Sequence, residues 1–503
     1  MTHRMWAELL QRMSGDSGGG SPPMLAKVLI RAAWAGKPVS RSAISKGSML
    51  LRPSALASGT VGKAVDALIG EGLLAEQAAT KSGQPGPPIT PLRLSGKWAI
   101  IGIHLDQQHD GPDRLAGIIC GLDRKPLTEL VRGEVPSKDG QHDLRRLAGE
   151  IRRLTESLLA QLDGPRKFLG VGLEIGGHVH RGIVQDSVHA GWRQVDLQEI
   201  LTEELGGIPE LRGIPAVAEN DINALAIHGS YERSLDGLDV ALVTVFRQGV
   251  GGALILDGHL YRGAGGMAPE PGHLAVEYPE DNPAWTPPAT PGATAGSTFG
   301  DECLCSTTDR KAYGHVDTLA VPARIEGQLA ALKGGEKISL EKAAAAPVAV
   351  PRGDTLVLTD EAVVLRRAGR ALGRAITHMI NTLNPRPLVV RLPEALAKPA
   401  PQSSGTEYLD AVEREVDHAY STGPADARGE LLRLTVQSYA DNQVAHDGAV
   451  AAATTVFNAF IEHAQGHDGC PAPDEGGRRT GPATPGGPPS SPGAPARATP
   501  FHG

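Results

Sequence analysis

Long apolar stretches are absent: no run of 18 or more apolar residues occurs in the 503 residues. A membrane-spanning helix needs about 20 such residues, so the sequence excludes a transmembrane protein. The first segment, Met1 to Met13, is interrupted by Glu8 and Gln11, where a secretory signal peptide requires a continuous apolar core. We therefore expect a cytoplasmic protein with no membrane partner.

Cysteine and aromatic residues are also scarce. Four cysteines are too few for a disulfide framework in a chain of this length, which fits a reducing compartment. Cys303 and Cys305 are separated by one residue, a spacing that is poor for a disulfide bridge and good for a shared metal ion. Aromatics make up 4% of the residues, while Gly (63) and Pro (39) are abundant, which predicts many loops and at least one unfolded segment.

Negative charge dominates the chain as a whole but not its first part. The formal net charge is −8. Residues 1–98 carry 12 Lys and Arg against 5 Asp and Glu, a net of +7, whereas the remaining 405 residues carry 37 against 52, a net of −15. A basic N-terminal part attracts nucleic-acid phosphates, and an acidic body is repelled by them. Chance clustering of charge is the alternative interpretation.

Length and shifts in composition predict four segments. They are a flexible leader (1–23), a winged helix-turn-helix DNA-binding domain (24–96), an α/β domain with a Pro/Ala/Thr-rich insert at 283–298 (97–463), and a disordered Gly/Pro-rich tail (464–503).

The winged helix-turn-helix is predicted from the order of its elements. Apolar residues recur at helical spacing from Met24 to Trp34, a short helix capped by Ser40 follows, and Ser58 is expected to cap a third helix. A strand from Leu73 to Glu76 and a returning strand over residues 89–94 enclose a flexible tip. The third helix of such a domain enters the major groove. The residues expected to contact DNA are Arg41, Ser58, Thr60, Lys63, Lys81 and Gln84. A three-helix interaction module without DNA is the alternative.

From Ala99 onward, buried strands alternate with longer helices. Strands are predicted at 99–105, 115–122, 168–175, 240–246 and 251–261, and helices at about 141–163, 316–332 and 360–383. This alternation indicates an α/β body.

Several motifs in fixed order resemble the ROK family of repressors and sugar kinases. They are Glu-Asn-Asp-Ile-Asn at 219–223, the segment 261–276 with its Glu-x-Gly-His, Cys303-Leu-Cys305, the segment 176–197 and a small-residue helix near the end. The resemblance covers residues 24–463 and implies two actin-like lobes of the sugar-kinase type with a ligand in the cleft between them. It also implies that the sugar is bound by Asn220, Asp221, Glu270, His273 and Asp317. Carboxylates and amides suit this role, because they hydrogen-bond hydroxyl groups in fixed directions.

The first departure from the family pattern is in the cysteine motif that binds zinc in the family. The family's third cysteine would fall on Arg310, which cannot bind a cation. If five extra residues are allowed, His315 takes that place and completes a Cys₂His₂ set with His273, Cys303 and Cys305, and Asp317 replaces the family's sugar-binding glutamate. The two interpretations, a structural zinc ion and an inactive site with a free Cys-x-Cys pair, both remain open.

The loops that bind ATP phosphates in the family's kinases are altered here. The first motif, Asp-x-Gly-Gly-Thr, is replaced by residues 104–108, His-Leu-Asp-Gln-Gln, and the second, residues 247–253, retains glycines but loses the threonine. Side chains in such turns block the approach of phosphates to backbone N–H groups. Asp221 stands where the kinase's general base would be, and a base without a phosphoryl donor cannot catalyse transfer. We therefore expect no enzyme activity.

The DNA-binding part departs from the family as well. Gln84 occupies the place of the arginine in the wing's Gly-Arg-Pro, and the segment between Ser40 and Thr60 is several residues longer. The leading hypothesis is a sugar-responsive regulator, a repressor of carbohydrate-use genes, that binds a duplex operator as a homodimer or homotetramer. The alternatives are an ATP-dependent sugar or amino-sugar kinase with atypical loops, and a regulator whose pocket no longer binds sugar.

Overall fold

A computed structural model describes most of the chain up to Gly466. The described residues are 4–14, 21–34, 38–46, 55–79, 90–107, 112–135, 143–187, 191–232, 235, 239–263, 265–277, 303, 305, 314–353, 355–419 and 434–466. The predicted wing tip with Lys81 and Gln84, the predicted insert and residues 467–503 lie outside them. No helix within the described ranges combines the length and apolarity that a membrane crossing requires.

The N-terminal part contains three helices followed by a small antiparallel sheet, in the predicted order. Arg31 is buried and donates from its Nη1 to the backbone carbonyl of Ile44, so it connects the first of these helices to the second. Ser40 Oγ accepts from Ala43 N at 3.1 Å, which confirms the predicted cap. The elements are α2 (Pro22–Trp34), α3 (Arg41–Lys46), α4 (Ser58–Gly70), β1 (Leu74–Glu76) and β2 (Leu92–Leu94).

Ser58 does not cap its helix, so that prediction was wrong. It is the first residue of α4, Ala57 takes the cap position, and no side chain there bonds the free amides. Ser58 Oγ instead lies 3.3 Å from Ser45 Oγ, next to α3.

The predicted flexible leader contains a helix, α1 (Arg4–Ser14). Its buried residues are Trp6, Leu9, Leu10 and Met13, a spacing that forms one face of a helix. Trp6 Nε1 donates to the carbonyl of Leu169 at 2.8 Å, and its ring meets Phe460 edge-on. The prediction was wrong for residues 4–14, because it extended the Gly/Ser/Pro composition of residues 14–23 to the whole segment.

The α/β body is built from two five-stranded sheets with the same strand connectivity. Their orders are β10-β6-β3-β4-β5 and β13-β12-β11-β16-β17. In each, the first strand of the lobe pairs antiparallel with the second and parallel with the fourth. The predicted two-lobed architecture is thus present, with one lobe repeating the fold of the other.

The first lobe extends from residue 98 to residue 220. Its elements are β3 (Trp98–Asp106), β4 (Asp113–Gly121), β5 (Val131–Val135), α5 (Leu144–Leu159), β6 (Lys167–Ile175), β7 (His178–His180), β8 (Ile183–Ser187), β9 (Trp192–Asp196), α6 (Leu197–Leu205), the short helix η1 (Pro209–Leu211) and β10 (Ala216–Asn220).

The second lobe holds the remaining elements. They are α7 (Asp221–Glu232), β11 (Val240–Val245), β12 (Val250–Leu256), β13 (His259–Tyr261), η2 (Pro271–His273), α8 (Val316–Leu319), α9 (Pro322–Leu332), α10 (Leu340–Ala345), β14 (Ala349–Arg352), β15 (Thr355–Leu358), α11 (Asp360–Leu383), β16 (Leu388–Pro393), α12 (Glu394–Ala397), α13 (Ser404–Ala419) and β17 (Leu434–Tyr439).

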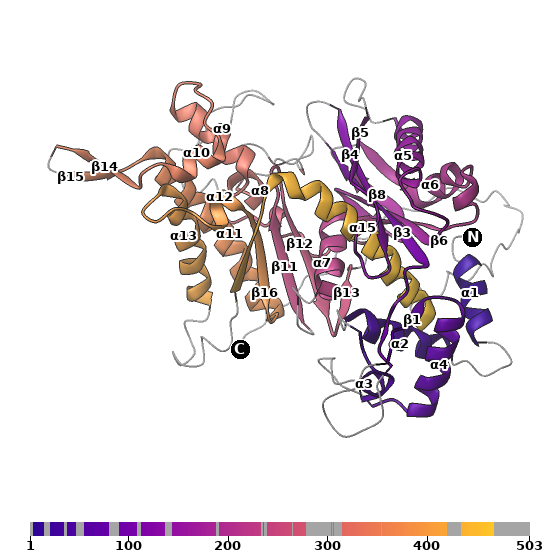
Figure 1. Cartoon of the computed structure of the whole chain (residues 1–503). Helices are drawn as coiled ribbons and strands as arrows, with labels where there is room; N and C mark the ends of the chain where they lie inside the picture. Colours follow the sequence, from indigo (N-terminus) through magenta and orange to yellow (C-terminus); the bar gives the residue numbers. More distant parts are fainter. Residues whose placement is uncertain are drawn as a thin grey trace, which may run out of the picture. The chain divides into compact units, whose positions relative to one another are not determined.

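The last helix, α15 (Asp441–Gln465), returns to the first lobe and packs on β3, β6 and α7. Figure 1 shows it in yellow, reaching from the second lobe past β3 to α2. This close packing requires glycine in the strands, since a Cβ on Gly102 would overlap the carbonyl oxygen of Ala449 and one on Gly172 that of Ala452. The N-terminal half of α15 thereby closes one side of the pocket described next.

Candidate functional site

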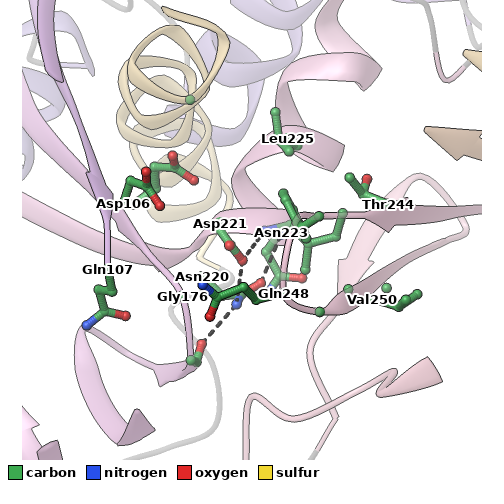
Figure 2. A pocket seen from close by; sticks show the side chains of 18 of the residues that line it. Asp106, Gln107, Gly176, Asn220, Asp221, Asn223, Leu225, Thr244, Gln248 and Val250 are labelled. Atoms are coloured by element: carbon green, nitrogen blue, oxygen red, sulfur yellow. Dashed lines mark hydrogen bonds between the residues drawn. The ribbon is translucent and has the colours of Figure 1, made fainter. Parts of the chain in front are cut away.

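One pocket of about 440 Å³ is lined by both lobes and by the start of α15. Its walls come from the ends of β3, β6 and β10, the start of α7, the turn between β11 and β12, and η2. Figure 2 shows Asp106 and Gln107 on one side, Thr244 and Val250 on the other, and Asn220 and Asp221 between them. All five predicted sugar-binding residues line this pocket: Asn220, Asp221, Glu270, His273 and Asp317.

Asn220 and Asp221 are held rigidly where β10 ends and α7 begins. Asn220 Nδ2 donates to the carbonyl of Gly177 at 2.9 Å and to Asp221 Oδ1 at 3.0 Å. The same Asp221 oxygen accepts from Ile222 N at 2.7 Å. Two hydrogen bonds thus fix Oδ1 of Asp221, a residue that lines the pocket.

Glu174 and His104 stand behind Asp221, and sequence reasoning missed them as a pair. They are direct neighbours in the parallel pairing of β3 and β6, and Glu174 Oε1 is bonded to His104 Nδ1. Burial, reinforced by the charge of Glu174, raises the pKa of Asp221 to about 7. Burial alone would lower the pKa of His104, but the negative charge of Glu174 and the hydrogen bond to it raise this pKa. Carboxylates therefore crowd this end of the pocket.

Glu270, His273 and Asp317 form the opposite end. Glu270 Oε1 lies 2.9 Å from His178 Nε2, and this hydrogen bond raises the pKa of His178. Asp317 Oδ1 accepts from Val250 N at 2.7 Å, so it is bound to the glycine-containing turn between β11 and β12. His178, which also lines the pocket, was missed although it lies in the segment 176–197 that resembles the family.

The four predicted metal ligands converge beside this end of the pocket. The donor atoms of His273, Cys303, Cys305 and His315 all lie within 4.8 Å of one another. Cys303 Sγ lies 3.5 Å from His273 Nδ1, and Cys305 Sγ lies 3.5 Å from His315 Nδ1. Ligands at about 2.0 to 2.3 Å around a tetrahedral ion are separated by roughly 3.6 Å, so these side chains fit a metal ion. The set includes His315, as the shifted alignment predicts.

The altered phosphate loops are occupied by side chains. Ser187 Oγ donates to Gln107 Oε1 at 3.2 Å, and Gln107 Oε1 is only 3.4 Å from the place of a Cβ on Gly176. At the second loop, Asp317 already takes the amide of Val250. Gln107 Oε1 and the amide of Val250 are thus already hydrogen-bonded within the protein.

Glu219, the first residue of the Glu-Asn-Asp motif, is held by hydrogen bonds next to Asn220 and Asp221. It is buried and receives two hydrogen bonds from Arg262, at 2.8 and 3.0 Å, and one from Asn223 Nδ2 at 3.1 Å. Arg262 was not predicted, because nothing in its local sequence shows that it reaches Glu219.

Four of the six predicted DNA-contacting residues are described. Ser58, Thr60 and Lys63 are exposed along the first two turns of α4. Arg41 forms ion pairs within the domain: its Nη1 donates to Asp66 and its Nη2 to Glu76, each at 2.8 Å. The first two turns of α4 thus expose small side chains and one lysine, Asp66 is exposed further along the helix, and Arg41 connects α3 with α4 and β1.

Comparison with known proteins points to one family. The ROK family model matches residues 147–393. A glucokinase of Halalkalibacterium halodurans is 27% identical over 243 residues, which cover 47% of this chain and 66% of that protein. The xylose repressor of Bacillus spizizenii is 23% identical, with 50% of this chain and 60% of the repressor covered. The chain therefore spans slightly less than two thirds of the length of these two relatives.

A further relative and a solved structure match a larger share of the chain. The DNA-binding transcriptional dual regulator NagC of Escherichia coli is 27% identical over 364 residues, covering 70% of this chain and 76% of NagC. The crystal structure of a ROK family transcriptional regulator, a homolog of the E. coli MLC protein, superposes with a TM-score of 0.60 at 20% identity. It covers 88% of this chain and 99% of that chain, and so shares its fold.

Proposed function

Because residues 147–393 match the ROK family model, we propose that this chain is a sugar-responsive transcriptional repressor in which a carbohydrate effector binds between the lobes. The observation that carries this proposal is the joining of two features in one chain. A basic helical domain exposes Ser58, Thr60 and Lys63 on one helix, and a pocket gathers carboxylates and amides from both lobes. The first suits duplex DNA and the second suits a polyhydroxylated ligand.

Transfer of the signal follows from the position of the ligand. A sugar that contacts residues of both lobes binds best at one lobe angle, so it shifts the population toward that angle. In a homodimer or homotetramer, such a shift changes the spacing of paired recognition helices on a dyad-related operator.

The metal group is proposed to hold a structural zinc ion. Two thiolates and two imidazoles are the donor set that zinc prefers, and four protein ligands leave no open position for catalysis. Zinc would fix η2, and with it Glu270 and His273, against α8.

We propose that the protein has no kinase activity. In support of this, the Gln107 side chain stands where the first phosphate loop has a glycine, and Asp317 binds the amide of Val250 in the second loop, which removes one backbone N–H group that could bind ATP phosphates. A kinase would show ATP-dependent phosphorylation of a sugar that Asp221→Asn abolishes.

A salt-dependent mobility shift tests the proposed function. The full chain is titrated onto duplex DNA from the promoter of its own operon at 50 to 200 mM salt, with and without monosaccharides. We expect binding that weakens steeply with salt and is relieved by one carbohydrate. Absence of any binding at low salt would refute the proposal.

A further inference from the structure

Carboxylates far outnumber cations around the pocket. Its lining includes Asp106, Glu174, Asp186, Asp221, Glu270, Asp317, Asp441 and Asp447, but only three arginines, Arg114, Arg247 and Arg391, and no lysine. Two of the arginines are already paired. Arg391 donates to Asp447 at 3.2 Å and stacks over Tyr439, and Arg247 donates to Glu326 at 2.8 Å. An anionic ligand would therefore find few partners here.

The end around Asp221 is the least suited to an anion. Glu174 lines the pocket although it is only 1% exposed, and its buried Oε2 atom has no hydrogen-bond partner. His104, the basic group beside it, is already bound to Glu174 Oε1. The raised pKa of Asp221 is consistent with this, because burial and the nearby charge of Glu174 disfavour the negatively charged form of the Asp221 carboxyl group.

The surrounding backbone prevents these groups from moving aside. Gly448 of α15 lies directly against the pair, and a Cβ there would overlap both Glu174 Oε1 and the ring of His104. Across the pocket, Thr244 is 1% exposed, and its Oγ1 also lacks a partner. Unpartnered Glu174 Oε2 accepts a hydrogen bond from a neutral hydroxyl or an ammonium group and repels a phosphate.

From this geometry we infer that the effector is an unphosphorylated sugar, whose hydroxyl or amino group donates to Glu174 and Asp221, and that phosphate esters are excluded. The inference rests on the proposed sugar response and specifies the chemical form of the ligand. Neutral sugars and amino sugars share the donating groups, and the experiment separates them.

Isothermal titration calorimetry with matched pairs tests this inference. Glucose, N-acetylglucosamine and glucosamine are each compared with their 6-phosphates on the full-length protein, and xylose is added as a neutral sugar without a matched ester. We expect at least one free sugar to bind at least about tenfold more tightly than its ester, because like charges repel strongly in a buried site. Tighter binding of glucosamine than of glucose would identify an amino sugar as the preferred form.

Glu174→Gln removes one charge at nearly constant shape. In this variant the preference for the free sugar over its ester should fall at least about threefold, mainly through tighter ester binding. Glu413→Gln removes an exposed charge on α13, outside the pocket, and should leave the preference unchanged.

The possible failures are distinguishable. An ester that binds as tightly as its free sugar overturns the inference and leaves the sugar response intact. If no sugar and no ester binds a chain that still shifts DNA, the proposed sugar response fails and the inference fails with it. An unchanged preference in Glu174→Gln, with folding verified by its thermal unfolding midpoint, contradicts the role of Glu174.

Discussion

The pocket and the exposed face of α4 are built in opposite ways. In the pocket, Asn220, Asp221 and Glu270 are bonded to other residues, so their positions are fixed before a ligand arrives. On α4, Ser58, Thr60 and Lys63 are exposed, and a Cβ added to Gly59 or Gly62 would meet nothing within 4 Å. A preorganised pocket recognises one shape, while an open helix face can approach a long, nearly uniform surface such as a duplex. Substitutions should therefore affect the two regions differently.

The largest effect is expected from removing the metal ligands beside the pocket. The double substitution Cys303→Ser, Cys305→Ser should abolish metal binding and lower the stability by about 4 kcal/mol when the metal is present at 1,000 times its Kd. Inductively coupled plasma mass spectrometry and urea unfolding measure the two effects.

Chelation provides the control for this experiment. A chelator should lower the stability of the unsubstituted protein to that of the variant and leave the variant unchanged. A purified, unsubstituted protein that binds no zinc and is insensitive to the chelator would contradict the prediction.

The second prediction applies the same substitution at the contact between β3 and α15, next to the pocket, and on α4. Gly102→Ala should destabilise the protein by about 3 kcal/mol, because the new methyl group forces the backbone of α15 away from β3. Gly62→Ala lies in open space inside helix α4 and should stabilise it by up to about 1 kcal/mol. Urea unfolding checks both, and equal effects at the two positions would contradict the described packing.

Features that depend on local sequence were predicted best. The order of elements in the N-terminal domain follows from turn residues and periodicity, whereas the two lobes and the convergence of His315 with Cys303 and Cys305 are implied by the resemblance to the ROK family. The spacing of Trp6, Leu9, Leu10 and Met13 also signals helix α1, and it was overlooked in favour of composition.

Features that depend on register or on distant partners could not be predicted. His104 and Glu174 are 70 residues apart and become neighbours only through the register of β3 and β6, which periodicity does not determine. Arg41 was predicted to contact DNA. Its partners, Asp66 and Glu76, are brought to it only by the folding of α4 and β1 against α3.

The third prediction concerns the pH dependence of the pocket. The pKa of Asp221 is raised from 3.8 to about 7 on folding, so the native state binds this proton more tightly than the unfolded state. The stabilisation is complete below pH 3.8 and is lost as the pH rises through 7, with a slope of at most about 1.4 kcal/mol per pH unit. The raised pKa of His104 acts in the same direction.

Asp221→Asn should remove this part of the slope. Between pH 5.5 and 7.5, the unsubstituted protein should lose about 1 to 2 kcal/mol more than the variant, as measured by urea unfolding. Asp410→Asn, at an exposed position on α13, should behave like the unsubstituted protein. Parallel pH profiles for all three proteins would contradict the assignment.

The smallest effects are expected from substituting two basic residues of the N-terminal domain, one exposed and one in ion pairs. Lys63→Ala should weaken DNA binding about fivefold and reduce the salt dependence by the equivalent of about one phosphate contact, because its exposed ammonium is available to the backbone of the duplex. Arg41→Ala should leave the salt dependence nearly unchanged and lower the stability by about 0.5 kcal/mol, since its ion pairs with Asp66 and Glu76 are partly exposed. Fluorescence anisotropy at several salt concentrations measures the first quantity and thermal unfolding the second. If Arg41→Ala reduced the salt dependence as much as Lys63→Ala does, Arg41 would contact phosphate directly, and its ion pairs would have to open when DNA binds.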